Sequence, residues 1–258
     1  MGQPQPLIVA FGGGVNSAAM LIGMHERGIR PDLILFADTG GEKPETYAYL
    51  DIIRRWLGAV GFPELVTVEK DSMYTSLEDQ CHRTRTLPSL AYGWKSCSEK
   101  WKRKPQDKFC NHWPAAVAAW QAGQKCTKAI GYDADEERRA KIAADAKYTY
   151  WYPLIEWQWG REECLAAIAR AGLPKPPKSA CFFCPASKKP EILWLARTHP
   201  DLFRRAIAIE GAAAETLKTV KGLGRYFSWA EFVKMTAQEQ QATCEGPECP
   251  CGCFDGDE

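Results

Sequence analysis

Short apolar runs alternate with amphipathic stretches along the first half of the chain. The runs lie at 7–11, 33–37, 65–69 and 128–131. Between them, 16–27 and 44–57 have the spacing of helices that bury one face, and Pro44 suits a first helical turn. Strands that alternate with helices predict an α/β fold, a parallel sheet sandwiched by helices. Ligands of such sheets bind at the carboxyl ends of the strands.

The remainder of the chain is predicted to be mainly helical. Helices are expected at 114–122, 136–146, 161–171, 190–198, 201–216 and from Ser228 to about 241. Residues 71–113 lack clean periodicity and indicate a long loop with helical turns. We therefore expect a nucleotide-binding domain at 1–190, a C-terminal helical segment at 191–241 and a Cys-rich acidic tail at 242–258.

Composition excludes several classes of protein. The 258 residues are 45% hydrophobic and 25% charged, with a net charge of +1, which is typical of a globular protein and not of a disordered or membrane-spanning one. The first ten residues hold no Lys or Arg, so no secretory signal is expected. Eleven cysteines in such a chain favour thiolates and metal over disulfides and indicate a cytoplasmic location.

A run of glycines follows the first predicted strand, in Ala10-Phe-Gly-Gly-Gly-Val-Asn-Ser17. Glycines let a backbone approach a ligand closely, and the N–H groups of a helix start attract an anion such as phosphate. The turn lacks the Lys-Ser/Thr pair of a Walker A loop. A plain strand-to-helix turn is the alternative.

The turn resembles the pyrophosphate loop, Ser-Gly-Gly-x-Asp-Ser, of the N-type ATP pyrophosphatases. It is more similar to their phosphoadenylyl-sulfate (PAPS) reductase branch, with its phage and DNA-sulfur-modification relatives. Four further stretches resemble that branch in the same order. They are Phe36-Ala-Asp-Thr-Gly40 with Pro44-Glu-Thr-Tyr47, Ser96-Cys97 through Lys102 and Pro105, Gly131-Tyr-Asp-Ala-Asp-Glu-Glu-Arg-Arg139, and Pro153-Leu154 and Trp157 with Cys181-Phe-Phe-Cys184-Pro185.

The resemblance covers about residues 7–190 and implies an adenine nucleotide α-hydrolase-like, Rossmann-like domain that binds ATP and Mg²⁺. The nucleotide-binding residues it implies are Phe11, Gly12, Gly13, Gly14, Asn16, Ser17, Asp38, Thr39, Gly131, Arg138 and Arg139, and the catalytic ones are Asp38 and Lys102. Asp38 as a turn residue, and the two arginines as surface partners of acidic side chains, remain alternatives.

Three positions depart from the family pattern. Gly12 replaces a Ser, Asn16 replaces an Asp and Asp133 stands where the family has Arg. The chain also lacks the Glu-Cys-Gly-x-His segment that carries the nucleophile of the sulfonucleotide reductases. The missing segment counts against a reductase, and Asp133 counts against one phosphate or substrate contact. Gly12, Asn16 and Asp133 also keep open a non-catalytic nucleotide-binding module.

Three cysteines match a known cluster arrangement. Cys181 and Cys184 form a chelating Cys-x-x-Cys turn, and Cys97 lies 84 residues upstream. This resembles the [4Fe–4S] site of assimilatory adenylyl-sulfate reductases, except that Ser98 replaces the fourth thiolate. An open iron that carries sulfide, a fourth ligand from Cys110 or the tail, and a zinc site are the alternatives. The tail thiols Cys244, Cys249, Cys251 and Cys253 could bind metal, relay sulfur or have no role. Cys81, Cys126 and Cys164 are expected to be buried apolar residues.

The segment 82–108 is basic, with eight Lys and Arg against two acids, and is interleaved with Trp94 and Trp101. This suits phosphate contacts and base stacking, or else a solvated loop with core tryptophans. Together with the resemblance, it predicts an ATP-dependent sulfurtransferase that acts on DNA, RNA or a nucleotide and takes sulfur from sulfide or a persulfide-bearing protein. A sulfonucleotide reductase and a non-catalytic nucleotide-binding module of a phage or defence complex are the alternatives. We expect no membrane partner and a bacterial or phage-infected cell, with a homodimer left open.

Overall fold

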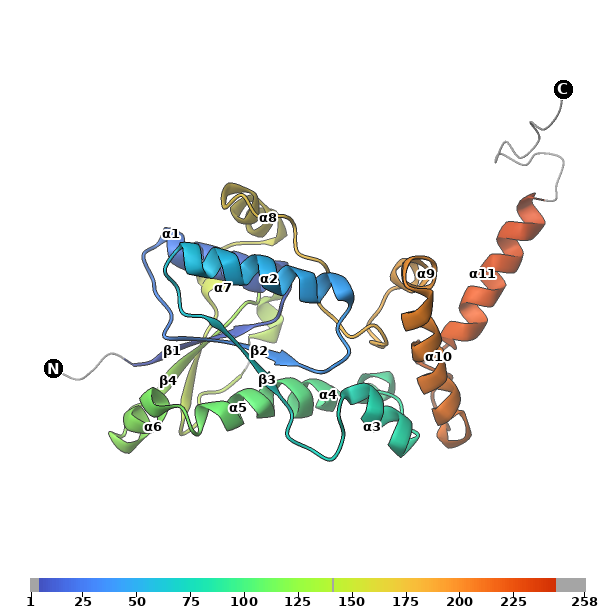
Figure 1. Ribbon diagram of the computed structural model, residues 1–258, viewed down its shortest axis with the longest axis horizontal. Helices are drawn as coiled ribbons and strands as arrows, with labels where there is room; N and C mark the ends of the chain where they lie inside the picture. The colour runs from blue at the N-terminus through green and yellow to red at the C-terminus, as the bar shows by residue number, and fades with distance from the viewer. Residues whose placement is uncertain (1–4, 141, 245–258) are drawn as a thin grey trace, which may run out of the picture. The chain divides into compact units, whose positions relative to one another are not determined.

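The computed structural model describes residues 5–140 and 142–244. Its sheet has five parallel strands in the order β3-β2-β1-β4-β5 (Figure 1). They are β1 (Leu7–Phe11), β2 (Leu33–Asp38), β3 (Leu65–Glu69), β4 (Cys126–Ile130) and β5 (Tyr148–Trp151). The predicted α/β sandwich is confirmed, and the first three strands lie where the apolar runs placed them. β4 begins two residues early, and β5 was not predicted.

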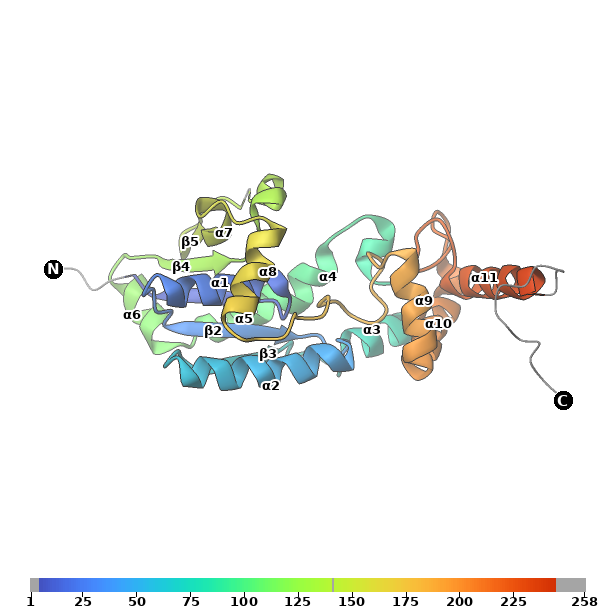
Figure 2. The ribbon, with the colours of Figure 1, turned by 90° about the horizontal axis from the view of Figure 1, so that it is seen from above.

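Helices cover both faces of the sheet (Figures 1 and 2). On one face lie α1 (Val15–Glu26), α2 (Pro44–Ala59) and α8 (Arg161–Arg170), and on the other lie α5 (Lys104–Cys110) and α6 (Pro114–Gln121). Alternation along β1 explains this arrangement. Val9 and Phe11 belong to the core cluster that contains α1, α2 and α8, whereas Ile8 belongs to the cluster that contains α5 and α6.

The central position of β1 sets the location of the site. The chain leaves β1 toward β2 on one side, and β4 pairs with the other side of β1. In open α/β sheets a crevice forms at the carboxyl ends of the two strands where the order reverses. Here those ends are Phe11 and Ile130, so the glycine turn and the segment that begins at Gly131 meet at this point.

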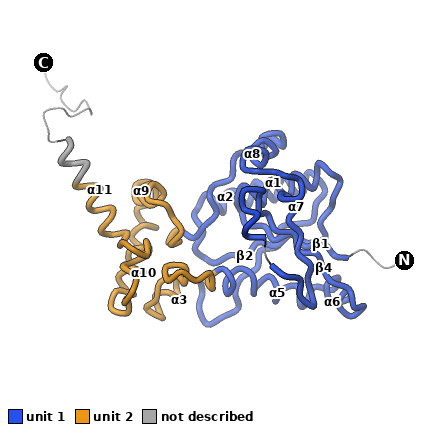
Figure 3. Tube along the Cα trace, turned by 180° about the vertical axis from the view of Figure 1, so that it is seen from behind, with its two compact units in different colours: residues 1–76, 98–181 blue, residues 77–97, 182–258 orange. Residues whose placement is uncertain are grey.

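The described chain divides into two compact units (Figure 3). The first comprises residues up to Ser76 and Ser98–Cys181, with the sheet, α7 (Pro153–Glu156) and the flanking helices. The second comprises Leu77–Cys97 and residues from Phe182 on, with α3 (Leu77–Thr84), α9 (Lys189–Thr198), α10 (Pro200–Ala213) and α11 (Trp229–Cys244). Residues 77–97 and 182–190, expected in the nucleotide-binding domain, thus fall in the second unit.

Two expectations of secondary structure need correction. Residues 136–146 are not a helix: a 3₁₀ turn, η3, covers Ala134–Arg139, and residues 142–147 form neither helix nor strand. The segment 71–113 is more helical than expected, since α4 (Ser96–Ser98), a π-helical turn (Glu99–Arg103) and α5 run together. Among the described residues, no helix is long and apolar enough to traverse a bilayer. The tail thiols Cys249, Cys251 and Cys253 lie outside the described residues.

Candidate functional site

The glycine turn joins the central strand to the start of α1. Gly13 has a φ of +77°, which favours glycine, and Gly12 is exposed. Gly14 precedes α1 in an extended conformation, and within the described chain no side chain caps this helix end. The N–H groups of the first turn of α1 are therefore left to an external acceptor, and an anion is the acceptor that the helix dipole favours.

Gly131 allows the segment after β4 to approach α1 closely. A Cβ at this position would lie 3.1 Å from the carbonyl carbon and oxygen of Asn16 and from the Cα of Ser17. These neighbours are backbone atoms that cannot rotate away. The glycine that sequence analysis implied as nucleotide-binding thus acts first by letting two backbones meet beside the turn.

Asn16 connects the turn to the acidic segment. Its Nδ2 donates to Asp133 Oδ2 at 2.9 Å and to Glu136 Oε2 at 3.1 Å, and its Oδ1 accepts from Arg161 Nη1 at 3.3 Å. Ser17 is buried, and its hydroxyl donates to the carbonyl of Gly14 at 3.0 Å. Both polar side chains of the turn therefore hold its shape in this structure.

Two buried polar atoms beside the turn lack partners. Asp133 is 4% exposed, and its Oδ1 makes no hydrogen bond to any described residue. Burial raises the pKa of this carboxyl. Thr46 is fully buried with its Oγ1 likewise unsatisfied by the described chain, and its methyl group lies 3.3 Å from a Cβ placed on Gly13. Such atoms are costly unless a ligand or water completes them.

Ser179 was missed by the sequence analysis. Its hydroxyl donates to the carbonyl of Gly12, and its side chain lies against the positions that Cβ atoms on Gly13 and Gly14 would occupy. The segment that leads to Cys181 therefore covers part of the turn. Nothing in the sequence marks this serine except its place two residues before the Cys-x-x-Cys.

Asp38 is the last residue of β2, and Thr39 begins the turn that follows this strand. Asp38 Oδ1 accepts from the N–H of Gly40 at 2.8 Å and from the hydroxyl of Tyr47 at 2.9 Å. Burial, reinforced by Asp38, raises the pKa of Tyr47, which keeps this hydroxyl a donor. The Oγ1 of Thr39 lies 3.1 Å from the Sγ of Cys181. Asp38 thus orders the turn, and Thr39 connects it to one of the predicted cluster ligands.

Glu42, which sequence analysis did not single out, links Lys102 to Cys181. Its backbone forms an antiparallel bridge with Cys181. Its side chain is completely buried, and Oε1 accepts from Lys102 Nζ at 2.8 Å. Lys102 is thereby paired with the residue whose backbone bridges to Cys181. The sequence feature that could have pointed to Glu42 as a site residue is its position in the turn after β2.

The two arginines do not share one environment. Arg139 pairs with Glu136, and its Cζ lies 4.3 Å from the ring centroid of Tyr132. Arg138 instead lines a cavity of about 390 Å³ together with Tyr152. Arg139 therefore has the acidic surface partner that the alternative interpretation expects.

Seven cysteines with described side chains fall into two classes and are free of disulfides: Cys81, Cys97, Cys110, Cys126, Cys164, Cys181 and Cys184. Burial raises the pKa of Cys81 and Cys164 to about 12 and that of Cys126 to about 11. Burial also raises the pKa of Cys110. Such thiols resist the deprotonation that metal binding needs. The burial of Cys81, Cys126 and Cys164 confirms their expected role.

Cys110 does not suit the role of fourth ligand. It is fully buried in the apolar cluster with Ile8 and Leu35, and desolvation disfavours its thiolate. The predicted ligands Cys97, Cys181 and Cys184 are all half-buried. Cys181 belongs to the first unit and the other two to the second. Among the described residues, no group of three or more His, Cys, Asp or Glu side chains is assembled around a metal position.

Three cations of the basic segment 82–108 are paired with acidic side chains, so they are less available for phosphate contacts than the sequence implied. Lys102 pairs with Glu42, Arg103 with Glu99 and Lys108 with Asp71. Its two tryptophans also differ: Trp101 is 2% exposed and Trp94 is 71% exposed. Trp101 is therefore a core tryptophan, as the second interpretation expects, and base stacking on the exposed Trp94 stays a prediction.

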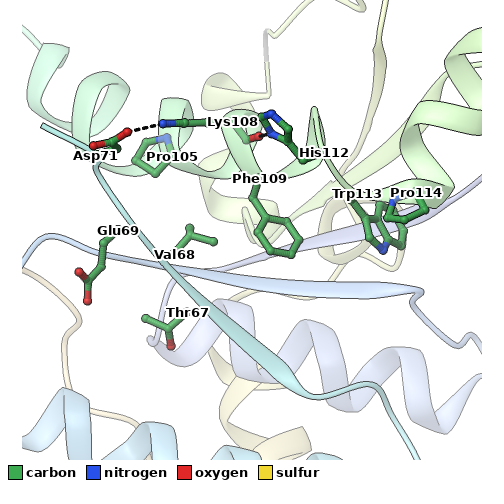
Figure 4. A pocket seen from close by; sticks show the side chains of 10 residues that line it. All are labelled: Thr67, Val68, Glu69, Asp71, Pro105, Lys108, Phe109, His112, Trp113 and Pro114. Atoms are coloured by element: carbon green, nitrogen blue, oxygen red, sulfur yellow. Dashed lines mark hydrogen bonds and ion pairs between the residues drawn. The ribbon is translucent and has the colours of Figure 1, made fainter.

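A cavity of about 450 Å³ lies along the edge strand β3 (Figure 4). Thr67–Glu69 form one side, and Phe109 and Trp113 form part of the other. The pair of Asp71 and Lys108 lies at this cavity, as the dashed line shows (Figure 4). None of the site residues implied by the family resemblance lines it, so it is separate from the glycine turn.

The fold and the turn define a class: α/β proteins with a glycine turn at the switch point of a parallel sheet. No protein-family model matches the sequence, and no curated protein matches it either. Among solved structures, the chain is similar to the U34-tRNA thiolase NcsA from Methanococcus maripaludis, determined with its [4Fe-4S] cluster. The identity is 15% and the TM-score 0.47, over 90% of this chain and 81% of that one.

Proposed function

We propose that the chain binds ATP on the glycine turn and uses it to activate a substrate for sulfur transfer. The observation that carries this proposal is the uncapped start of α1 at the switch point of the sheet. The unpartnered oxygens of Asp133 and Thr46, unsatisfied within the described chain, flank it. A phosphate would supply the acceptor for the N–H groups, and the unsatisfied carboxylate oxygen would be a ligand for Mg²⁺.

The first reaction is adenylation. A substrate oxygen attacks the α-phosphorus of ATP, and pyrophosphate leaves with the electron pair of the broken P–O bond. N–H donors of the residue 12–17 turn hold the charge that develops on the phosphates. Asp133 would hold the Mg²⁺ that accompanies them, since Mg²⁺ takes one or two carboxylates beside phosphate oxygens. Ser179, whose hydroxyl donates to the carbonyl of Gly12, would hold the backbone of this turn in place.

The second reaction is displacement of AMP by a sulfur nucleophile, which leaves a thiolated nucleic acid or nucleotide. Cys97, Cys181 and Cys184 are the thiols chemically suited to hold a [4Fe-4S] cluster, because they are not desolvated like the other four. Such a cluster supplies an iron that can carry sulfide. Lys102, held by Glu42 beside Cys181, would offset negative charge there.

The test is pyrophosphate release from ATP and its dependence on a polynucleotide. Gly13→Asp should abolish ATP binding, because the new side chain meets Phe36 and Thr46 and adds negative charge where phosphate binds. Gly28→Asp is the matched control: Gly28 has a similar φ of +67° and no neighbouring atom within 4 Å. Equal ATP affinity in the two variants would remove the turn from the site.

Two other outcomes separate the alternatives. Sulfite release from adenylyl sulfate with thioredoxin would assign a reductase. Tight ATP binding without any turnover would assign a non-catalytic nucleotide-binding module.

A further inference from the structure

The second unit exposes two large aromatic side chains on turns. Trp94 is 71% exposed and Tyr226 is 72% exposed. Trp94 follows the 3₁₀ helix η1 (Ser89–Tyr92), and Tyr226 lies in the connection between α10 and α11. Neither ring contributes to the buried core of this unit. Exposed aromatic rings with a polar edge are typical of surfaces that meet a partner.

Arg225 brings the two turns together. A Cβ placed on Gly93 would lie 3.2 Å from Arg225 Nη2 and 3.5 Å from its Cζ. The guanidinium therefore lies against the backbone of Gly93, immediately before Trp94. The Cζ of Arg225 also lies 5.1 Å from the ring centroid of Tyr226. One cation thus lies next to both turns that carry the exposed rings.

The turn that presents Tyr226 is held by its own hydrogen bonds. The N–H of Lys221 donates to the carbonyl of Arg225 at 2.8 Å, and the N–H of Arg225 donates to that of Gly222 at 2.9 Å. Arg225 has a φ of +63°, a conformation that few non-glycine residues adopt. The N–H of Leu223 donates to the buried Glu210 at 2.9 Å. A surface ordered in advance loses little conformational entropy on binding.

The charge of this surface selects the partner. Lys95, Lys221 and Arg225 are exposed, and residues 217–226 contain no acidic side chain. Glu215, just before this stretch, is paired with Arg85 at 3.6 Å. Cations that alternate with exposed rings complement a polymer that has regular anionic groups and flat, unpaired bases. That polymer is a single-stranded nucleic acid, since the bases of a duplex are already stacked.

We propose that residues 93–95 and 221–226 form a binding surface for single-stranded nucleic acid. Unpaired bases stack on Trp94 and Tyr226, and phosphates contact Arg225, Lys95 and Lys221. This surface would bind the nucleic acid that accepts sulfur in the proposed function. The proposal rests on that function only for the biological role of the bound nucleic acid. Binding itself requires neither ATP nor the cysteines.

The test is binding of a fluorescent oligouridylate of about 12 nucleotides to the full chain, measured by anisotropy without ATP. Trp94→Ala and Tyr226→Ala should each weaken binding about ten-fold, because stacking contributes about 1–3 kcal/mol per base. Tyr226→Phe should bind like the wild type. Met235→Ala, which removes another exposed apolar side chain of this unit, should also leave binding unchanged. Arg225→Ala should flatten the dependence of affinity on salt.

The proposal fails if Trp94→Ala and Tyr226→Ala bind like the wild type, or if a duplex of the same length binds as tightly as the single strand. It fails equally if the wild type does not bind RNA but self-associates through Trp94, as measured by analytical ultracentrifugation, because the surface is then a contact between copies of the chain. ATP binding in the same variants separates the two proposals. Loss of RNA binding with normal ATP affinity concerns this surface alone, and the Gly13→Asp variant should show the reverse.

Discussion

At the scale of single residues, a substitution at Gly131 tests whether its close approach to the backbone of Asn16 and Ser17 is needed for ATP binding. Gly131→Ala should lower ATP affinity about ten-fold and destabilise the fold by about 1–3 kcal/mol, because the added methyl group overlaps the backbone of residues 16 and 17. Calorimetric titration with ATP and urea unfolding measure the two effects. Gly58→Ala, in α2 with no neighbour within 4 Å, should instead stabilise the protein slightly. Unchanged ATP affinity in Gly131→Ala would contradict this account.

Asp133 makes a prediction about pH. Burial raises its folded-state pKa above the ordinary value of 3.8, so the folded chain binds more protons than the unfolded chain just above pH 3.8. The contribution of Asp133 to stability therefore falls as pH rises through this window and is unfavourable at neutral pH. Asp133→Asn should be more stable than the wild type at pH 7 and should lose that advantage below pH 3.8.

The same variant tests the proposed Mg²⁺ ligand. Asp133→Asn keeps an oxygen that can accept from Asn16 but removes the charge. We expect ATP affinity in the presence of Mg²⁺ to fall, while affinity for ATP without metal stays constant or rises. Unfolding midpoints and titrations with and without Mg²⁺ provide both measurements. Equal Mg²⁺ dependence in variant and wild type would show that Asp133 does not hold the metal.

Single residues also show where sequence reasoning succeeds. Three consecutive glycines after an apolar strand predicted the turn, because glycine at such a place has a conformational meaning independent of tertiary contacts. Glu42 and Ser179 were missed for the opposite reason. Their positions depend on the segment near Cys181 returning to the first two strand ends, and no local pattern encodes such a contact.

At the scale of elements, α11 depends on one buried carboxylate from α10. Glu210 accepts hydrogen bonds from the N–H groups of Leu223, Trp229 and Ala230 and from the hydroxyl of Ser228. The predicted N-terminus of this helix at Ser228 is correct, since its hydroxyl accepts from the N–H of Glu231. No local pattern marks Glu210, which accepts from more of these donors than Ser228 does.

Glu210→Gln should therefore destabilise the protein by about 2 kcal/mol, because the amide nitrogen would face backbone donors in a buried site. Urea unfolding followed by far-UV circular dichroism measures the change in the free energy of unfolding. Glu231→Gln is the matched control, an exposed acid in the first turn of α11, and should shift the midpoint little. Identical midpoints for the two variants would mean that Glu210 does not stabilise the start of α11.

The incorrect helix at 136–146 has a tertiary cause. Its Glu, Arg and Ala residues have good helix propensity, but Asn16 binds Asp133 and Glu136, and Arg139 packs on Tyr132. The chain also turns just before β5, where the N–H of Asp145 donates to the carbonyl of Tyr148 at 3.1 Å, and β5 then pairs with β4 in parallel. The aromatic run Tyr148–Trp151 is typical of a strand, and it was overlooked because the predicted helix ended close to it.

At the scale of the whole molecule, the parallel sheet followed from periodicity, but the division into units did not. Residues 77–97 join the C-terminal helices through contacts such as the ion pair of Glu78 and Arg205. Pairing between residues so distant in sequence leaves no periodic signal. Cys97 and Cys184 thereby belong to one unit and Cys181 to the other, although a motif-by-motif comparison treats all three as parts of one domain.

Iron content tests the proposed ligand set against the remaining cysteines. After anaerobic purification we expect bound iron and sulfide, with the broad visible absorption of an iron–sulfur cluster. Cys97→Ala, Cys181→Ala and Cys184→Ala should each lose most of this iron. Cys164→Ala and Cys110→Ala should retain it, because those thiols are fully buried and burial raises their pKa. Stoichiometric zinc without iron, or equal iron loss in both groups, would contradict the assignment, while retained ATP affinity in all five variants would leave the glycine turn unaffected.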